Sequence, residues 1–433
     1  MHALPVPKTQ TSLSLAWHSI PLVLAVAFTL RLVFVLATPP NVSGGDTLGL
    51  MQYGLALVRG QSAQMDNIPP LYLIYVGVVQ VIFGEASLTA LRLLNVLWSV
   101  ALVGTVYAAA DAYFSKRAAL IAAWLVAVNP IFIIEAGQVL TESVFLPLML
   151  GALALYGHYA RRGKPIRARQ VVWVGALLGL ASLTRAVALA LPIIFAAHLV
   201  WCYRWRALRL MTALLGAYAL VVLSWTAYGY LRWGTFMISG AGLAANFYLG
   251  TNEGWCGPEC VDERAGIGVE DEGKNDQIYT QLAFEAILSD PLGYVGRRLS
   301  NLLEASLQPH NTVFFSGESL KALFLTWWTT DRSVAGFGNV LSGDAFLPKL
   351  TLYIFHFGAL LLGMVGVLFG VFRWRLFWQA LPLYGVLFYF YALHSLLTAI
   401  PRYLFPTAAL WLIFAGAALA RRTTIENQDE QPA

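Results

Sequence analysis

Apolar residues run along the chain in blocks of about twenty, and short polar or charged stretches separate the blocks. About 20 residues of helix, at 1.5 Å each, cross the roughly 30 Å of hydrocarbon in a bilayer, so each block is typical of a transmembrane helix. The first block contains Arg31 and lacks a small-residue cleavage site, which favours a membrane helix over a cleaved signal peptide. The pattern predicts about ten spans, over residues 17–37, 88–110, 117–135, 140–159, 171–186, 187–203, 209–230, 350–371, 377–397 and 403–420.

Composition agrees with this pattern. Of 433 residues, 58% are hydrophobic and 12% are charged, whereas soluble domains carry roughly 25% charged residues. A soluble globule is therefore excluded, and the expected fold class is an all-α polytopic membrane protein.

Lysines and arginines gather in alternate loops, which indicates the side of the membrane on which each loop lies. The basic loops should be cytoplasmic, with both termini on that side, and the membrane is expected to be the inner (plasma) membrane. Two large segments, 38–87 and 231–349, then face outward, and the second holds most of the acids. The predicted organisation is an N-terminal membrane module with its first outer loop, an outer-face segment, C-terminal spans and a cytoplasmic tail, at residues 1–230, 231–349, 350–420 and 421–433.

The first outer loop, 38–87, should hold two short helices that lie at the membrane interface. One begins near Asp46 and stops at Gly60; the other begins at Pro69-Pro70, and both are too short to span. Asp46 has two interpretations. It could simply cap its helix through backbone N–H groups, or it could act chemically at the boundary between water and membrane.

The long outer segment shows helical apolar spacing that breaks at Asp290-Pro291, followed by a tryptophan-rich stretch, "LKALFLTWWTT". Both are expected to form helices along the membrane that partly cover a cavity. Cys256 and Cys260 form a C-x-x-x-C pair in this segment. They could close a disulfide in an oxidising compartment, remain free, or form half of a metal site.

Three arginines stand near outward helix ends, where the charge rule would not place them: Arg92, Arg185 and Arg402. Each could snorkel or pair with an acid. Alternatively, each could contact an anionic group, and the apolar flank of Arg402 makes it the best candidate for a phosphate contact. Arg297-Arg298, on the outer segment, could do the same work at the rim, or could lie in water.

Glu142 follows Thr141 at the start of a predicted span. Thr141 and Glu142 could serve only to begin the helix. Glu142 could instead be a second acid beside Asp46 that tunes it or helps to hold a divalent ion, and Glu135 is a weaker candidate for the same role.

Seven stretches along nearly the whole chain resemble GT-C polytopic glycosyltransferases, and most of all the branch of the protein mannosyltransferases and lipid A aminoarabinose transferases. Each stretch is short, but their order and topology together are specific for the superfamily. They are Asp46 with Tyr53, Ala56 and Gly60; Pro69-Pro70-Leu71-Tyr72 with Phe83-Gly84; "ALRLLNVLWSV"; "NPIFIIEAGQVLTESVF"; "GLASLTRAVALALP"; "GAGLAANFYLGTNEG"; and "IPRYLFPTAALWLIFAG".

The resemblance implies transfer of a sugar from a polyprenyl-phosphate donor to a lipid, glycan or protein acceptor on the outer face. It implies that Asp46 is the base and Glu142 an auxiliary acid. Many relatives have Asp-Glu at the position of Asp46, whereas this chain has Asp46-Thr47. A role for a second adjacent acid therefore cannot be transferred to this chain. A Mg or Mn ion is left open, and the metal ligands are unknown. The predicted substrate contacts are Tyr53, Tyr72, Arg92, Arg185, Arg297, Arg402 and Tyr403.

The competing hypothesis is a transporter or flippase that binds a polyprenyl-linked lipid without chemistry. Its sequence support is weak, because the chain shows few intramembrane acids and no internal repeat. No nucleotide-binding motif is visible, so an activated group should arrive on a substrate, and no nucleic-acid partner is expected.

Overall fold

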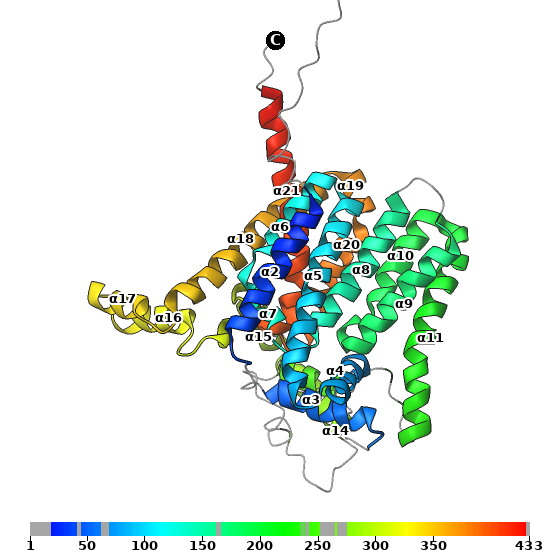
Figure 1. Ribbon diagram of the computed structural model, residues 1–433, viewed down its shortest axis with the longest axis horizontal. Helices are drawn as coiled ribbons and strands as arrows, with labels where there is room; N and C mark the ends of the chain where they lie inside the picture. The colour runs from blue at the N-terminus through cyan, green and yellow to red at the C-terminus, as the bar shows by residue number, and fades with distance from the viewer. Residues whose placement is uncertain are drawn as a thin grey trace, which may run out of the picture.

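The computed structural model describes residues 19–40, 45–61, 69–161, 166–234, 236, 238, 242–251, 265 and 275–429, and every regular element within them is a helix (Figure 1). The all-α prediction is confirmed. The N-terminal helices are α2 (Ile20–Ala37), α3 (Gly45–Val58), α4 (Pro70–Phe83), α5 (Ser87–Tyr113), α6 (Lys116–Ala127), α7 (Pro130–Ala136), α8 (Glu142–Arg161), α9 (Ala168–Thr184), α10 (Leu191–Tyr203) and α11 (Ala207–Trp233). The remaining helices are α12 (Leu243–Thr251), α14 (Asn275–Ser289), α15 (Pro291–Leu307), α16 (Leu320–Thr330), α17 (Val334–Leu341), α18 (Phe346–Val371), α19 (Trp374–Gln379), α20 (Leu381–Leu396) and α21 (Pro401–Asp429).

The described residues contain 6 helical stretches long and apolar enough to cross a membrane, or 7 if α6 and α7, bent by 60° at their junction, make one span. The chain is a multi-pass membrane protein. The predicted number of ten spans is not confirmed. Helices α9 and α20, with 17 and 16 residues, are shorter than the 18 residues taken here as the minimum for a span. Helices α10 and α11 lie in one continuous stretch, Ala186–Trp233. The 6 stretches are Ile20–Ala37, Ser87–Tyr113, Glu142–Ala160, Ala186–Trp233, Phe346–Val371 and Pro401–Ala420.

Arg31 is fully buried inside α2, where the sequence shows a charge in an apolar block. Its Nε donates to Ser99 Oγ at 2.6 Å, and its Nη atoms donate to the carbonyl oxygens of Ala127 at 2.8 Å and Val126 at 3.1 Å. These carbonyls lie at the end of α6, where the chain bends and helical partners run out. Arg31 therefore stabilises the α6–α7 bend.

Helices α3 and α4 lie at the end of the bundle opposite the C-terminus (Figure 1). They cross closely because Gly54 and Gly77 face each other: a Cβ on Gly54 would lie 2.7 Å from the carbonyl oxygen of Leu73 and 3.0 Å from the backbone N of Gly77. Pro70 occupies the first turn of α4, as predicted. Both expected short helices of this loop are confirmed as helices.

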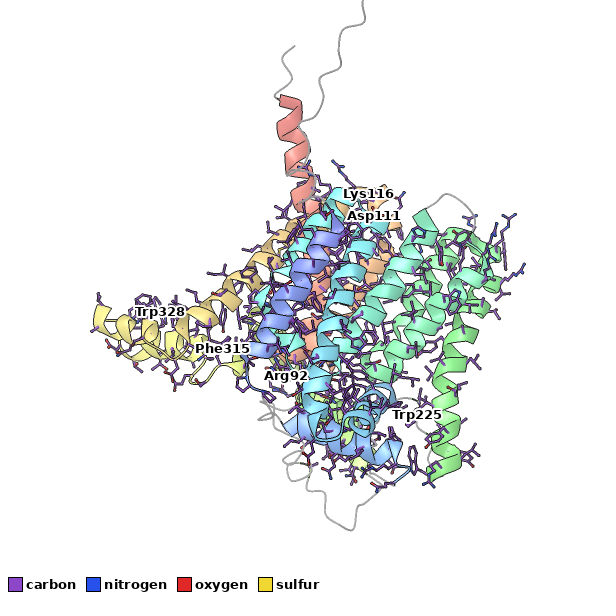
Figure 2. All side chains as sticks on the ribbon, in the orientation of Figure 1. Arg92, Asp111, Lys116, Trp225, Phe315 and Trp328 are labelled. Carbon is purple, nitrogen blue, oxygen red and sulfur yellow. The ribbon has the colours of Figure 1, made fainter. Side chains whose placement is uncertain are left out.

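The outer-segment sequence also folds as helices. Asp290 caps α15 by accepting a hydrogen bond from Gly293 N at 2.9 Å, with Pro291 in the first turn, so the predicted break between α14 and α15 is confirmed. The backbone hydrogen bond from Gly293 and the bond from Arg297 lower the pKa of the exposed Asp290 carboxyl. Helices α16 and α17 extend sideways from the start of α18, and Figure 2 labels Trp328 on this arm. Cys256 and Cys260 lie outside the described residues, so their pairing stays a prediction.

Candidate active site

Four charged side chains that are far apart in the sequence meet where four helices begin or end. Asp46 lies in the first turn of α3, Glu142 in the first turn of α8 and Arg402 in the first turn of α21, while Arg185 is the extended residue directly after α9. Helix ends leave backbone groups unpaired and direct the chain into loops, which suits polar side chains. We call Asp46, Glu142, Arg185 and Arg402 the charge cluster.

Glu142 is the buried centre of the charge cluster, with none of its side chain exposed. Its Oε1 accepts a hydrogen bond from Arg402 Nε at 2.7 Å and pairs with Arg185 Nη1. Its Oε2 accepts from Thr141 Oγ1 at 3.0 Å and from Arg402 Nη2 at 3.4 Å. A buried carboxylate is tolerated only when it is paired and hydrogen-bonded, and both oxygens meet that condition here.

Arg402 reaches a second acid with its remaining nitrogen. Its Nη1 pairs with Asp46 Oδ2, so one guanidinium bridges Glu142 inside and Asp46 outside. The Asp46 side chain is 59% exposed, against 25% for Arg402. Two carboxylates and two guanidiniums cancel in formal charge, and the exposed edge of the cluster is the Asp46–Arg402 pair.

Tyr403 lies beside the cluster on α21. Its ring stacks on His394 at 5.5 Å between centroids and 22° between planes, and His394 Nδ1 lies 3.0 Å from the carbonyl oxygen of Thr398. Arg185 also sits near an aromatic ring, 5.9 Å from the centroid of Phe145.

Arg92, predicted as a phosphate contact, is placed differently. It is buried, and its guanidinium donates at 3.0 Å to the carbonyl oxygens of Gly137 and Thr38 and to Thr38 Oγ1. Figure 2 labels it towards the α3 and α4 end of the bundle. These bonds give Arg92 a structural task, and the structure does not bring it into the charge cluster.

Three further predicted contacts also lie outside the charge cluster. Tyr53 packs with the apolar side chains between α3 and α4, and Tyr72 is fully buried in the same apolar cluster. Arg297 donates to Asp290 Oδ2 at 2.9 Å on the exposed side of α15. Its neighbour Arg298 is buried instead and donates to the carbonyl oxygens of Gly250 at 2.8 Å and His394 at 3.1 Å.

A second buried polar group was not predicted as a unit. His310 Nε2 lies 2.9 Å from Glu135 Oε2, Asn311 Nδ2 donates to the same oxygen at 3.1 Å, and Gln138 Nε2 donates to Asn311 Oδ1 at 2.6 Å. These bonds attach the loop after α15 to α7 and to the short segment that leads to Glu142. The sequence signal was Pro-His-Asn within "SLQPHNTVFF", but His310 and Glu135 are 175 residues apart.

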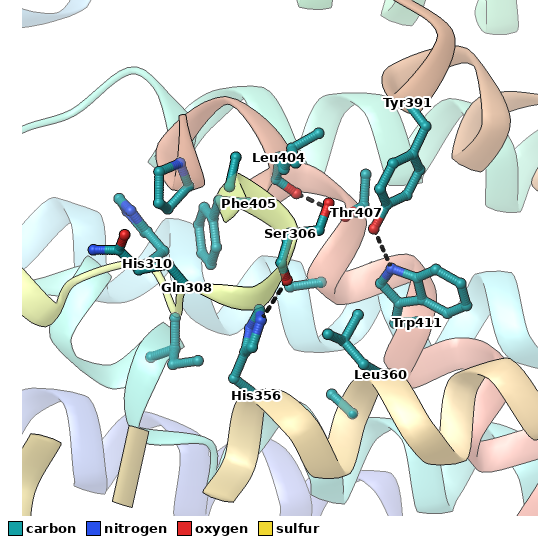
Figure 3. Close-up of a pocket in the computed structure, with 15 residues that line it drawn as sticks. Ser306, Gln308, His310, His356, Leu360, Tyr391, Leu404, Phe405, Thr407 and Trp411 are labelled. Atoms are coloured by element: carbon teal, nitrogen blue, oxygen red, sulfur yellow. Dashed lines mark hydrogen bonds between the residues drawn. The ribbon is translucent and has the colours of Figure 1, made fainter. Parts of the chain in front are cut away.

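A small, mostly apolar cavity lies between α15, α18 and α21 (Figure 3). Pro401 and Leu404, which flank Arg402 and Tyr403 in the sequence, contribute to its wall, as does Ile131 of α7. The few polar groups in its wall are largely paired: His356 Nε2 lies 2.8 Å from the carbonyl oxygen of Ser306, and Trp411 Nε1 donates to Tyr391 Oη at 3.0 Å. With a volume of about 30 Å³, the cavity has room for a single water molecule but not for an apolar chain.

The charge cluster does not fit a divalent cation. Two guanidiniums and a hydroxyl already donate to the oxygens of Glu142, and the positive charges that a metal ion would supply are present as arginines. In the part of the chain that the structure describes, no group of three or more His, Cys, Asp or Glu side chains could hold a metal ion. Neither Mg nor Mn has a step in the chemistry proposed below.

Comparison with known proteins agrees with the arrangement of helices. Residues 67–228 match the family described as dolichyl-phosphate-mannose-protein mannosyltransferase. The apo oligosaccharyltransferase of Archaeoglobus fulgidus overlaps 96% of this chain with a TM-score of 0.56 at 16% identity. The chain resembles GT-C glycosyltransferases. Its all-helical GT-C-like fold extends over nearly its whole length.

Two further structures complete this comparison. Archaeal oligosaccharyltransferase AglB from Archaeoglobus fulgidus, in complex with an inhibitory peptide and a dolichol-phosphate, overlaps 96% of this chain with a TM-score of 0.54 at 18% identity. Both archaeal matches cover 52% of the archaeal chain, so this GT-C-like chain spans about half the length of those proteins. ArnT from Cupriavidus metallidurans bound to undecaprenyl phosphate overlaps 94% of this chain and 77% of its own at 15% identity, with a looser TM-score of 0.44. No curated protein matches the sequence.

Proposed function

We propose that this protein is a glycosyltransferase of the inner (plasma) membrane. It moves a sugar from a polyprenyl-phosphate donor to an acceptor hydroxyl or phosphate at the outer face, with both termini in the cytoplasm. The observation that carries the proposal is the charge cluster, in which an exposed acid and two arginines meet at helix ends. The match of residues 67–228 to a mannosyltransferase family supports the same class of reaction.

The arginines are suited to the donor's phosphate. Guanidinium groups bind phosphate oxygens through paired, charge-assisted hydrogen bonds, and cations placed where charge develops help a phosphate to leave. Arg402 is partly exposed, and Arg185 contacts the same oxygen of Glu142, Oε1. An archaeal structure of similar fold was solved with a dolichol-phosphate.

Asp46 is the proposed general base. When the acceptor is a hydroxyl, its oxygen attacks the anomeric carbon, the bond from that carbon to the phosphate oxygen breaks, and polyprenyl phosphate leaves with the electron pair. The hydroxyl proton passes to Asp46, whose carboxylate is exposed enough to reach an acceptor. A single displacement of this kind inverts the anomeric carbon. Glu142 stays ionised and holds the two arginines.

Acceptor choice is proposed to lie with residues 231–349, whose described helices include α14 to α17. The acceptor is a lipid, a glycan or a protein. A peptide carrying an acceptor sequence was tethered in one archaeal oligosaccharyltransferase structure, but this chain spans about half of that protein, so its acceptor is a separate question. The divisions at residues 230, 349 and 420 remain part of this proposal.

The test is transfer from a panel of radiolabelled polyprenyl-phosphate sugars by the purified protein in proteoliposomes, with lipid movement between leaflets measured in the same vesicles. Sugar transfer with release of polyprenyl phosphate supports the enzyme. Movement of the donor lipid without transfer from any member of the panel overturns it in favour of a flippase.

A further inference from the structure

Asp46 and the proposed donor phosphate compete for the guanidinium of Arg402. The three donor nitrogens of Arg402 are divided between two acids: Nε and Nη2 face Glu142, whereas Nη1 faces Asp46. Nη1 therefore gives the guanidinium its contact with the exposed side of the cluster. An anion that arrives from outside meets the guanidinium at the place where the Asp46 carboxylate lies.

The buried contacts of Glu142 are not a place that this anion can take over. Glu142 is completely buried, and donors from Arg402, Arg185 and Thr141 already surround its oxygens. Separating Glu142 from these partners would leave a buried charge uncompensated, which is strongly unfavourable. The Asp46–Arg402 pair costs far less to separate, because Asp46 is mostly exposed and water replaces the contact.

We propose that the donor phosphate displaces the Asp46 carboxylate from Arg402, so that donor binding itself releases the base. This inference rests on the proposed function. A carboxylate and a phosphate both accept charge-assisted hydrogen bonds from a guanidinium, so the exchange keeps Arg402 paired throughout. The released carboxylate stands next to an anion rather than a cation, and that arrangement favours acceptance of a proton.

The exchange makes the reaction ordered. Before the donor binds, Asp46 Oδ2 is paired with Arg402 Nη1. After the donor binds, the base is free in the presence of the reactive anomeric carbon. Glu142 is then a positioning residue, which fixes Arg402 so that Nη1 points outward.

Binding of sugar-free polyprenyl phosphate to the purified protein in nanodiscs tests this exchange. Asp46→Asn should bind the probe about two- to fivefold more tightly than the wild type, because the competing carboxylate is gone, and Asp46→Ala should do the same. Asp290→Asn is the matched control, since Asp290 is also an exposed acid paired with an arginine, Arg297, and it should leave binding unchanged. Equal or weaker binding by both Asp46 variants overturns the exchange.

Arg402→Lys separates failure of this inference from failure of the proposed function. It keeps the positive charge beside Glu142 but loses the planar fork, and it should weaken probe binding at least tenfold in protein whose melting temperature is preserved. If the wild type does not bind the probe, or if Arg402→Lys binds it as well as the wild type, the proposed function fails. If Arg402→Lys weakens binding while the Asp46 variants bind like the wild type, only the exchange fails.

Discussion

Within the charge cluster, a buried glutamate holds two arginines, and one of these arginines reaches an exposed aspartate. The buried glutamate and the exposed aspartate have different tasks despite their shared chemistry. Glu142 is enclosed by donors, so its role is to fix the arginines, whereas Asp46 has the access to solvent that a base needs. The difference follows from burial at the two helix ends.

Glu142→Gln should destabilise the protein. The amide leaves Arg185 and Arg402 without their shared counter-charge, and breaking a buried pair costs about 3–5 kcal/mol. Thermal unfolding of the purified protein should show a clear fall in melting temperature. Glu304→Gln is the control, because Glu304 pairs with Lys321 at an exposed position and should have little effect. A Glu142→Gln protein that melts like this control would contradict the buried centre described here.

The sequence predicted the members of the cluster but not their pairing. Asp46, Glu142, Arg185 and Arg402 were all predicted site residues, yet Asp46 and Arg402 are 356 residues apart, and chain-local patterns carry no information on such a contact. Arg92 shows the converse. An arginine near an outward helix end has the same local pattern whether it binds a substrate or, as here, backbone carbonyls.

At the scale of elements, the position of Asp46 depends on the crossing of α3 and α4. Gly54 and Gly77 allow the two helices to approach, and this contact holds the helix whose first turn carries Asp46. A side chain at this point would push α3 away from α4. The proposed site therefore depends on a packing contact two turns from Asp46.

Gly54→Ala should lower transfer at least tenfold. The added methyl group would lie 2.7 Å from the carbonyl oxygen of Leu73, so the helices must separate, at a typical cost of about 1–3 kcal/mol. Initial rates of transfer and melting temperatures should be measured together. Gly104→Ala on α5 is the matched control, because nothing lies within 4 Å of its added Cβ. If the two variants are equally active, the α3–α4 crossing does not position the base.

The sequence predicted where helices begin more successfully than it predicted how many of them cross the membrane. Proline and aspartate fix the starts of α4 and α15, because their effects act within one turn. Whether an apolar helix of 16 or 17 residues crosses the membrane depends on tilt and on neighbours, so ten spans could not be established from the blocks alone. The buried polar group of Glu135, His310 and Asn311 was not predicted, because its members are far apart in the sequence, like the pairs in the charge cluster.

At the scale of the whole molecule, the two ends of the bundle carry different helices. Figure 2 labels Lys116 at the end where α21 emerges and Arg92 towards the end that carries α3 and α4. The all-α fold was predictable because composition and block length left no alternative. The sideways arm of α16 and α17 was not, because its helices follow from local spacing but their direction does not.

Cysteine labelling should assign the two ends to the two sides of the membrane. In a chain whose native cysteines are replaced by serine, Asp276→Cys at the start of α14 should react with a membrane-impermeant maleimide in intact cells or spheroplasts. Lys116→Cys should react only after the membrane is permeabilised. The reverse pattern would contradict an outward-facing site.

Asp46 is proposed to act as the general base in sugar transfer. Once a donor is identified, single-turnover release of polyprenyl phosphate should be compared between wild type, Asp46→Asn and the control Asp290→Asn, all at saturating donor and acceptor. Loss of a general base typically costs about 10²–10⁴ in rate, so we expect a fall of that size in Asp46→Asn alone, with the donor still bound. If Asp46→Asn releases polyprenyl phosphate at the wild-type rate, Asp46 is not the general base.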